Sequence, residues 1–161
     1  MHPYIEKILA TLEDRDPIAV LEATPLRLEE ISAGFDHDDF QRSYAPGKWT
    51  AREVLAHLAD CEIGLGFRFR QALAEENHQV QPFDQDLWAR RYARFDPALA
   101  LDAFSGLRRW NLTLFTTFDL NDWLRPVRYS FEGIDNVDTM VRFLAGHDLN
   151  HLAQLEQIGK G

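Results

Sequence analysis

The stretch Met140-Val-Arg-Phe-Leu-Ala-Gly-His-Asp-Leu-Asn-His-Leu-Ala-Gln-Leu-Glu-Gln-Ile158 carries the clearest structural signal in the chain. Its apolar residues recur three and four positions apart, the spacing that gives an α-helix one apolar face. At about 100° per residue, His147 and His151 fall within about 20° of the centre of that face. The stretch therefore predicts a helix that points two imidazoles, one turn apart, into a protein core.

The same apolar spacing recurs along the chain and predicts four main helices. Their start signals are a capping aspartate before proline at Asp16-Pro17 and Asp96-Pro97, and the capping box of Thr50 and Glu53. A proline at position 25 should kink the first main helix. Residues 4–13 form either a short leading helix or the first turns of a longer one. The four predicted helices cover residues 17–34, 50–76, 97–118 and 137–159.

The segment 77–96 is long for a connection within a helix bundle. It is either a crossover between parallel helices or a lid over a site, and residues 84–91 within it suit a short helix. Residues 119–136 are irregular in pattern, with 127–131 suited to an extended strand. We expect residues 1–161 to form one all-α domain, a four-helix bundle.

The composition excludes several classes of protein. The formal net charge is −9 and the basic residues are scattered, which argues against binding to nucleic acid. No apolar run reaches the roughly 18 residues of a membrane span, and no signal peptide is recognisable. The single cysteine, Cys61, suits a reducing compartment. We therefore expect a cytoplasmic protein with no nucleic-acid or membrane partner.

A third histidine, His57, lies at the edge of the apolar face of the predicted helix 50–76. It follows the start signal Thr50 by seven residues, while His151 precedes Ile158, the last apolar residue of its helix, by seven. If the two helices run antiparallel, all three imidazoles meet at one level. Three neutral nitrogen ligands with an open position suit a catalytic zinc or nickel site.

Other interpretations of these residues remain open. A single histidine on an apolar face is more often a core residue bonded to the backbone. The pattern H-E-x-x-H is absent because Asp148 follows His147, so a zinc protease has no support. Cys61 lies one turn after His57 and would close the coordination shell as a fourth ligand. A small apolar core residue is the favoured role for Cys61.

Several neighbours of the histidines are candidates for supporting roles. Glu53 and Asp60 flank His57 and could orient its second nitrogen, although a helix cap for Glu53 and a solvated face for Asp60 are the favoured interpretations. Gly64 and Arg68 share the edge of the helix that carries His57. A glycine there leaves room for a ligand, and an arginine could hold an anionic group.

Two further expectations concern side chains elsewhere. Gln154 lies beside His147 and His151 and is a candidate hydrogen-bond donor to their site. The tryptophans at positions 49, 110 and 123 are expected to pack in the core or at the bundle ends.

The stretch Pro46-Gly-Lys-Trp-Thr-Ala-Arg-Glu-Val-Leu-Ala-His-Leu-Ala-Asp-Cys-Glu62, together with Gly146-His-Asp-Leu-Asn-His-Leu-Ala-Gln154, resembles the DinB/YfiT-like superfamily and its DinB-like subgroup. The resemblance extends over residues 17–158. It implies an up-down-down-up four-helix bundle, with 77–96 as the crossover between the second and third helices. It also implies a divalent metal ion, nickel or zinc, held by His57, His147 and His151.

Characterised members of this superfamily include bacillithiol S-transferases and a mycothiol-dependent maleylpyruvate isomerase domain, in which the thiol is thought to bind the metal as thiolate. The resemblance thus implies a metal-dependent S-transferase or hydrolase that activates water or a low-molecular-weight thiol against a small-molecule substrate. A non-catalytic, metal-binding, stress-related dimer is the first alternative, and a metal-free bundle with core histidines is the second. We expect a homodimer in either metal-bound case.

Overall fold

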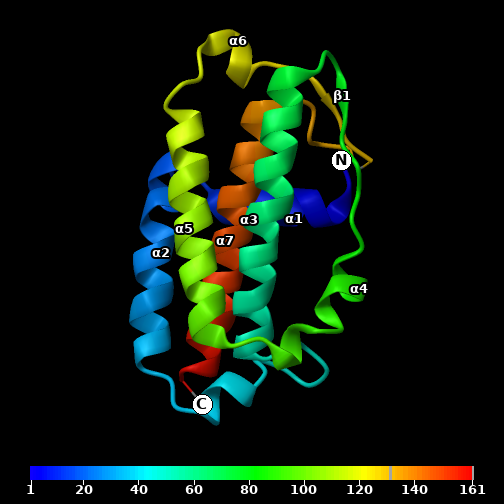
Figure 1. The fold of residues 1–161 in the computed structure, drawn as a ribbon. Coiled ribbons are helices and arrows are strands. Elements are labelled where there is room, and N and C mark those ends of the chain that lie inside the picture. Colours follow the sequence, from blue (N-terminus) through cyan, green and yellow to red (C-terminus); the bar gives the residue numbers. More distant parts are fainter. Residues whose placement is uncertain (131, 161) are drawn as a thin grey trace.

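Four long helices form the bundle in the computed structural model, which describes residues 1–130 and 132–160 (Figure 1). Helices α2 and α7 run in one direction, and α3 and α5 run in the other, so the up-down-down-up prediction is confirmed. The main contacts join α3 to α5 and α2 to α7, which are parallel neighbours. The four helices are α2 (Pro17–Ala33), α3 (Ala51–Ala74), α5 (Pro97–Phe115) and α7 (Val137–Ile158).

The predicted start signals act as expected. The Asp16 carboxylate accepts hydrogen bonds from two amides of the first turn of α2, and Asp96 does the same for α5. Thr50 and Glu53 form a reciprocal capping box at α3, and α7 begins after the cap Asn136. Helices α3 and α5 end two to three residues earlier than the periodicity predicts, where fraying ends carry little sequence signal.

The predicted crossover is present between α3 and α5. Residues 75–96 leave the end of α3, run back along the outside of the bundle and return to the start of α5 (Figure 1). This path is required because parallel neighbouring helices begin at the same end of a bundle. The crossover contains β1 (His78–Gln79), α4 (Gln85–Ala89) and the short 3-10 helix η2 (Tyr92–Arg94).

The remaining elements are small and lie at the ends of the bundle. The sequence did not predict the small parallel sheet in which β1 pairs with β2 (Val127–Arg128). The expected extended stretch 127–131 is thus confirmed for two residues, whereas residue 131 lies outside the described residues. The others are η1 (Asp39–Gln41) and α6 (Leu120–Trp123). Among the described residues, no helix has the length and apolar character that crossing a membrane requires.

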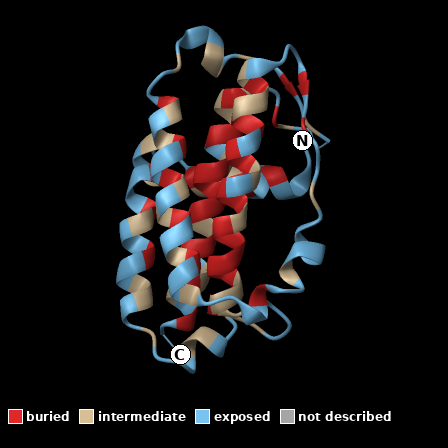
Figure 2. Ribbon diagram, in the orientation of Figure 1, coloured by how far each residue is buried: buried red, intermediate tan, exposed pale blue. Residues whose placement is uncertain are grey.

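The core lies between α3 and α7, the two helices with the most buried residues (Figure 2). Helix α1 (Pro3–Leu12) is a separate leading helix that crosses the bundle and packs on α7. The two helices approach closely at Gly146, where a Cβ atom would overlap the backbone carbonyl of Ile8. The glycine immediately before His147 therefore allows α1 to pack closely on α7.

Gly146→Ala is expected to destabilise the protein by about 1–3 kcal/mol, since the added methyl group meets rigid backbone and must displace α1. Urea denaturation followed by circular dichroism measures the change. The matched control is Gly106→Ala in α5, where a Cβ has open space and helix propensity predicts a gain of about 0.5–1 kcal/mol. Equal effects of the two substitutions would contradict the proposed close contact.

Candidate metal centre

Three buried histidines converge between α3 and α7. The Nε2 atom of His147 lies 3.1 Å from Nε2 of His57 and 3.1 Å from Nε2 of His151. One ligand nitrogen from each of the three residues lies within 4.8 Å of the other two, and each side chain is at most 5% exposed. The predicted convergence is therefore present. It arises because α3 and α7 run antiparallel, which brings the one histidine of α3 to the pair on α7.

All three imidazoles are neutral at neutral pH. Burial lowers the pKa of His57 and of His147 well below its ordinary value, and the neighbouring imidazoles add to the effect. Burial also lowers the pKa of His151 to about 4, although Gln154 opposes the change. Neutral imidazole is the protonation state that binds a metal ion.

The hydrogen bond at Nδ1 of His151 shows which nitrogen of that ring is free to bind a metal ion. The Nδ1 atom of His151 lies 2.7 Å from Oε1 of Gln154, so His151 donates this hydrogen bond and its Nε2 lone pair is free. Gln154 is thus an acceptor beside the site, which corrects the expected donor role. Such a hydrogen bond to the outer nitrogen fixes ring orientation and tautomer in metal-ligating histidines.

The Nε2 atom of His147 faces the Nε2 atoms of two other imidazoles, and a cation between the rings would account for both contacts. A neutral ring has one proton, and a proton on Nε2 would serve only one of the two imidazole contacts there. Three inward lone pairs around a metal ion would need no proton between the rings.

The spacing of the nitrogens also fits a metal. Bonds of about 2.0–2.1 Å place neighbouring nitrogen ligands about 2.8–3.4 Å apart, from octahedral to tetrahedral geometry. The two contacts of 3.1 Å lie within that range. The donor set of three imidazoles suits zinc or nickel.

The other predicted neighbours of His57 do not orient it. Glu53 is engaged in the capping box, where Oε2 accepts from the Thr50 amide at 2.8 Å. Asp60 lies beside Tyr92, and burial raises the pKa of its carboxyl. Glu53 therefore has the capping role that the sequence favoured. The solvated face expected for Asp60 is wrong, because its side chain is half-buried.

Cys61 lies close to the histidines and outside the ligand group. Its Sγ atom is 3.4 Å from Nε2 of His57, but within the described part of the chain the converging ligand atoms are those of the three histidines alone. Burial raises the pKa of the Cys61 thiol, and Glu62 adds to the rise, so the side chain is a neutral thiol. This agrees with its expected role as a small core residue.

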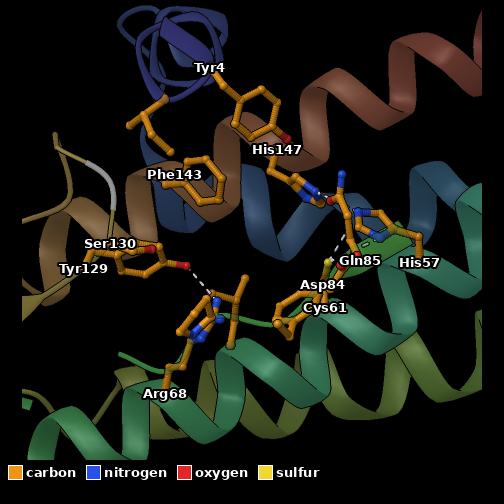
Figure 3. Close-up of a pocket in the computed structure, with 14 residues that line it drawn as sticks. Tyr4, His57, Cys61, Arg68, Asp84, Gln85, Tyr129, Ser130, Phe143 and His147 are labelled. Carbon is orange, nitrogen blue, oxygen red and sulfur yellow. Dashed lines mark hydrogen bonds between the residues drawn. The ribbon is translucent and has the colours of Figure 1, made fainter. Parts of the chain in front are cut away.

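A cavity of about 330 Å³ opens beside the histidines (Figure 3). His57, His147 and Cys61 line one part of it, while the remaining walls come from α1, α3, α7, the crossover and the loop after β2. Arg68 lines the cavity, as its predicted role requires. Gly64 does not, because it lies against the Phe83 ring and lines a second groove with Trp88.

Aromatic rings cover the histidines. The Trp49 ring lies 4.6 Å from the ring of His57 and stacks at 6.4 Å on that of His151. Trp49 thus packs against the bundle as expected, and it also shields the site from solvent. The same expectation is wrong for Trp110, which is 64% exposed on α5.

A buried ion network beside the histidines was missed by the sequence analysis. Arg108 of α5 is fully buried and donates from Nη1 to Asp148 Oδ2 at 2.6 Å and from Nη2 to Glu62 Oε1 at 2.7 Å. Asn111 donates to Glu62 Oε2 at 3.0 Å. Burial alone would lower the pKa of Arg108, but the two carboxylates raise it above its usual value, so the guanidinium stays charged.

Pro25 contributes to this network because proline has no backbone N–H to donate. A residue at this position of α2 would normally donate to the carbonyl of Leu21, and proline cannot. The Leu21 carbonyl accepts instead from Nη1 of Arg108 at 3.1 Å. The proline that was expected to kink the helix thus leaves an acceptor for the buried arginine.

Comparisons with known proteins agree with this architecture. A model of the DinB superfamily matches residues 21–155. The chain is 26% identical over 141 residues to a "putative metal-dependent hydrolase" of Oceanobacillus iheyensis, covering 87% of this chain and 82% of the relative. It is 25% identical over 146 residues to the "putative metal-dependent hydrolase YfiT" of Bacillus subtilis, covering 89% and 82%.

A solved structure is also similar. YfiT from Bacillus subtilis, described as "a probable metal-dependent hydrolase with an unusual four-helix bundle topology", superposes with a TM-score of 0.84. The identity is 24%, and the match covers 89% of this chain and 84% of that one. This likeness shows that the two chains share a fold.

Proposed function

Because this chain belongs to the DinB superfamily, we propose that it is a metal-dependent hydrolase of small molecules whose His57, His147 and His151 hold a divalent metal ion. The observation that carries the proposal is the convergence of three buried, neutral imidazoles, with Nε2 of His147 3.1 Å from Nε2 of each of the other two. The names of the relatives, metal-dependent hydrolases, support the same activity. Imidazole donors suit zinc, nickel, copper and iron, and zinc or nickel is proposed because the resemblance to the superfamily implies one of these two.

When bound, such an ion lowers the pKa of a water molecule and supplies a nucleophile near neutral pH. The chain contributes the ligands and the surroundings. His151 is held by Gln154, and Trp49 shields the outer side of the site. His57 and His147 also line the cavity, which gives a substrate access to the same place. The cavity favours this function over a non-catalytic metal-binding protein.

The proposal is tested first by metal content. Purified protein should contain about one zinc or nickel ion per chain, and removal with a chelator should abolish hydrolysis of activated esters. Returning the ion at 100 times its Kd should stabilise the fold by about 2.7 kcal/mol through mass action. A chelated sample reloaded with magnesium is the control, since three imidazoles do not suit that ion. No stoichiometric metal and no thermal shift would reject the proposal.

A second assay separates water from thiol as the activated group. Metal-loaded protein is given an electrophile with and without a low-molecular-weight thiol. Thiol consumption without ester hydrolysis would replace the hydrolase proposal with the S-transferase. The homodimer, the cytoplasmic location and the absence of nucleic-acid partners stay predictions, of which light scattering of the purified protein measures the first.

A further inference from the structure

Arg68 is a buried cation in the wall of the cavity that His57 and His147 also line (Figure 3). Its side chain extends from α3 and is 6% exposed. Nη1 donates to the Tyr129 hydroxyl at 2.7 Å, and Nη2 donates to the Gln81 carbonyl at 2.7 Å. The guanidinium carbon also lies 4.9 Å from the centre of the Phe83 ring.

Every one of these partners is uncharged. Within residues 1–130 and 132–160, Arg68 makes no ion pair with a carboxylate, whereas buried Arg108 makes two. A buried charge without a counter-ion is costly, and proteins usually provide one. Asp84 lines the same cavity, but its carboxylate caps α4 by accepting from the amides of Asp86 and Leu87.

The shape and lining of the cavity suit a ligand that places a negative charge beside Arg68. A guanidinium has five N–H donors, and the two protein bonds of Arg68 leave donors free for a ligand. Apolar side chains of Ile5, Leu65 and Phe143 line the same cavity. A ligand that fills this space would have a charged end at Arg68 and an apolar body.

We propose that Arg68 binds the carboxylate of a small, partly apolar substrate whose reacting group lies beside the histidines. This inference rests on the proposed function for the reacting end, but not for the carboxylate end. A single negative charge is favoured over a phosphate because Arg68 is the only Lys or Arg side chain lining the cavity within the described residues. A doubly charged group would remain half-neutralised there, with Asp84 nearby.

A purely structural role for Arg68 makes a different prediction. Through Gln81 and Tyr129, Arg68 links α3 to the crossover and to the loop after β2. If that were its only role, its replacement would lower stability but would not change any preference for charged ligands. The test therefore measures discrimination between ligands.

The experiment is calorimetric titration of chelated, metal-free protein with benzoate, benzamide and phenyl phosphate at fixed ionic strength. Benzoate should bind about tenfold more tightly than its uncharged isostere benzamide, the gain expected of a charge-assisted hydrogen bond. Arg68→Met should abolish that preference, and Arg68→Lys should keep part of it. The control Arg142→Met removes an exposed arginine on α7 and should keep all of it.

Equal binding of benzoate and benzamide to the wild-type protein, or no binding of benzoate, would overturn the inference without any variant. Binding of phenyl phosphate more tightly than benzoate would overturn the assignment of a carboxylate. If Arg68→Met does not fold, as judged by circular dichroism, the wild-type and Arg68→Lys titrations decide. The titration uses metal-free protein, so it tests the carboxylate site even if the protein proves not to be a hydrolase. Absence of the carboxylate preference would likewise not count against the metal site.

Discussion

Arg108→Met is expected to destabilise the protein by about 3–5 kcal/mol, the cost of breaking a buried ion pair by removing one partner. The substitution keeps an apolar stem of similar length but leaves the carboxylates of Glu62 and Asp148 buried without their cation. It also removes the donor to the Leu21 carbonyl. Urea denaturation followed by circular dichroism measures the loss.

Arg109→Met is the matched control, because Arg109 is the exposed next residue of the same helix. Its replacement should change stability by no more than about 0.5 kcal/mol. A second control replaces the carboxylates as well, in Arg108→Met, Glu62→Gln and Asp148→Asn together. This triple variant should be more stable than Arg108→Met alone, because no unpaired charge remains. A similar small loss for Arg108→Met and Arg109→Met would contradict the importance of the network.

His151→Ala is expected to weaken binding of zinc or nickel by at least about 100-fold, more than loss of a group that only orients a ligand. The His151 ring contacts both Trp49 and His147, and its removal leaves only two imidazoles in the group. Competition with a chromophoric chelator measures the affinity. Ester hydrolysis should fall in parallel.

Two further variants make this result specific. His37→Ala removes an exposed loop histidine and should leave metal affinity unchanged. Gln154→Ala removes the acceptor for the Nδ1 proton of His151 and should weaken binding by about 10–100-fold. Metal affinity that is equal in the His151→Ala and His37→Ala proteins would show that the ion binds elsewhere.

The sequence predicted the parts of this structure that depend on local pattern. Capping signals at Asp16, Thr50 and Asp96 placed the helix starts, and the length of segment 77–96 indicated a crossover. The three histidines were found because two share one helix face and the third has a matching depth. Each of these inferences needed the geometry of no more than two helices.

What the sequence did not predict depends on contacts between several helices. Arg108 resembles any arginine of an amphipathic helix until α2, α3 and α7 supply Leu21, Glu62 and Asp148 around it. The only local clue was Pro25, which frees a carbonyl that some donor must satisfy. Gly64 was misplaced for a similar reason, because its neighbour Phe83 comes from the crossover, whose path the sequence left open.

The central position of α7 has a consequence for how the protein is made. Helices α1, α2 and α3 all pack on α7, yet α7 follows them in the sequence. During synthesis, α2 and α3 can already pack on α5, but the apolar faces of α1, α2 and α3 that contact α7 stay uncovered until residues 137–158 have left the ribosome. His57 likewise meets His147 and His151 only after α7 has been made, so the proposed metal site forms late in synthesis.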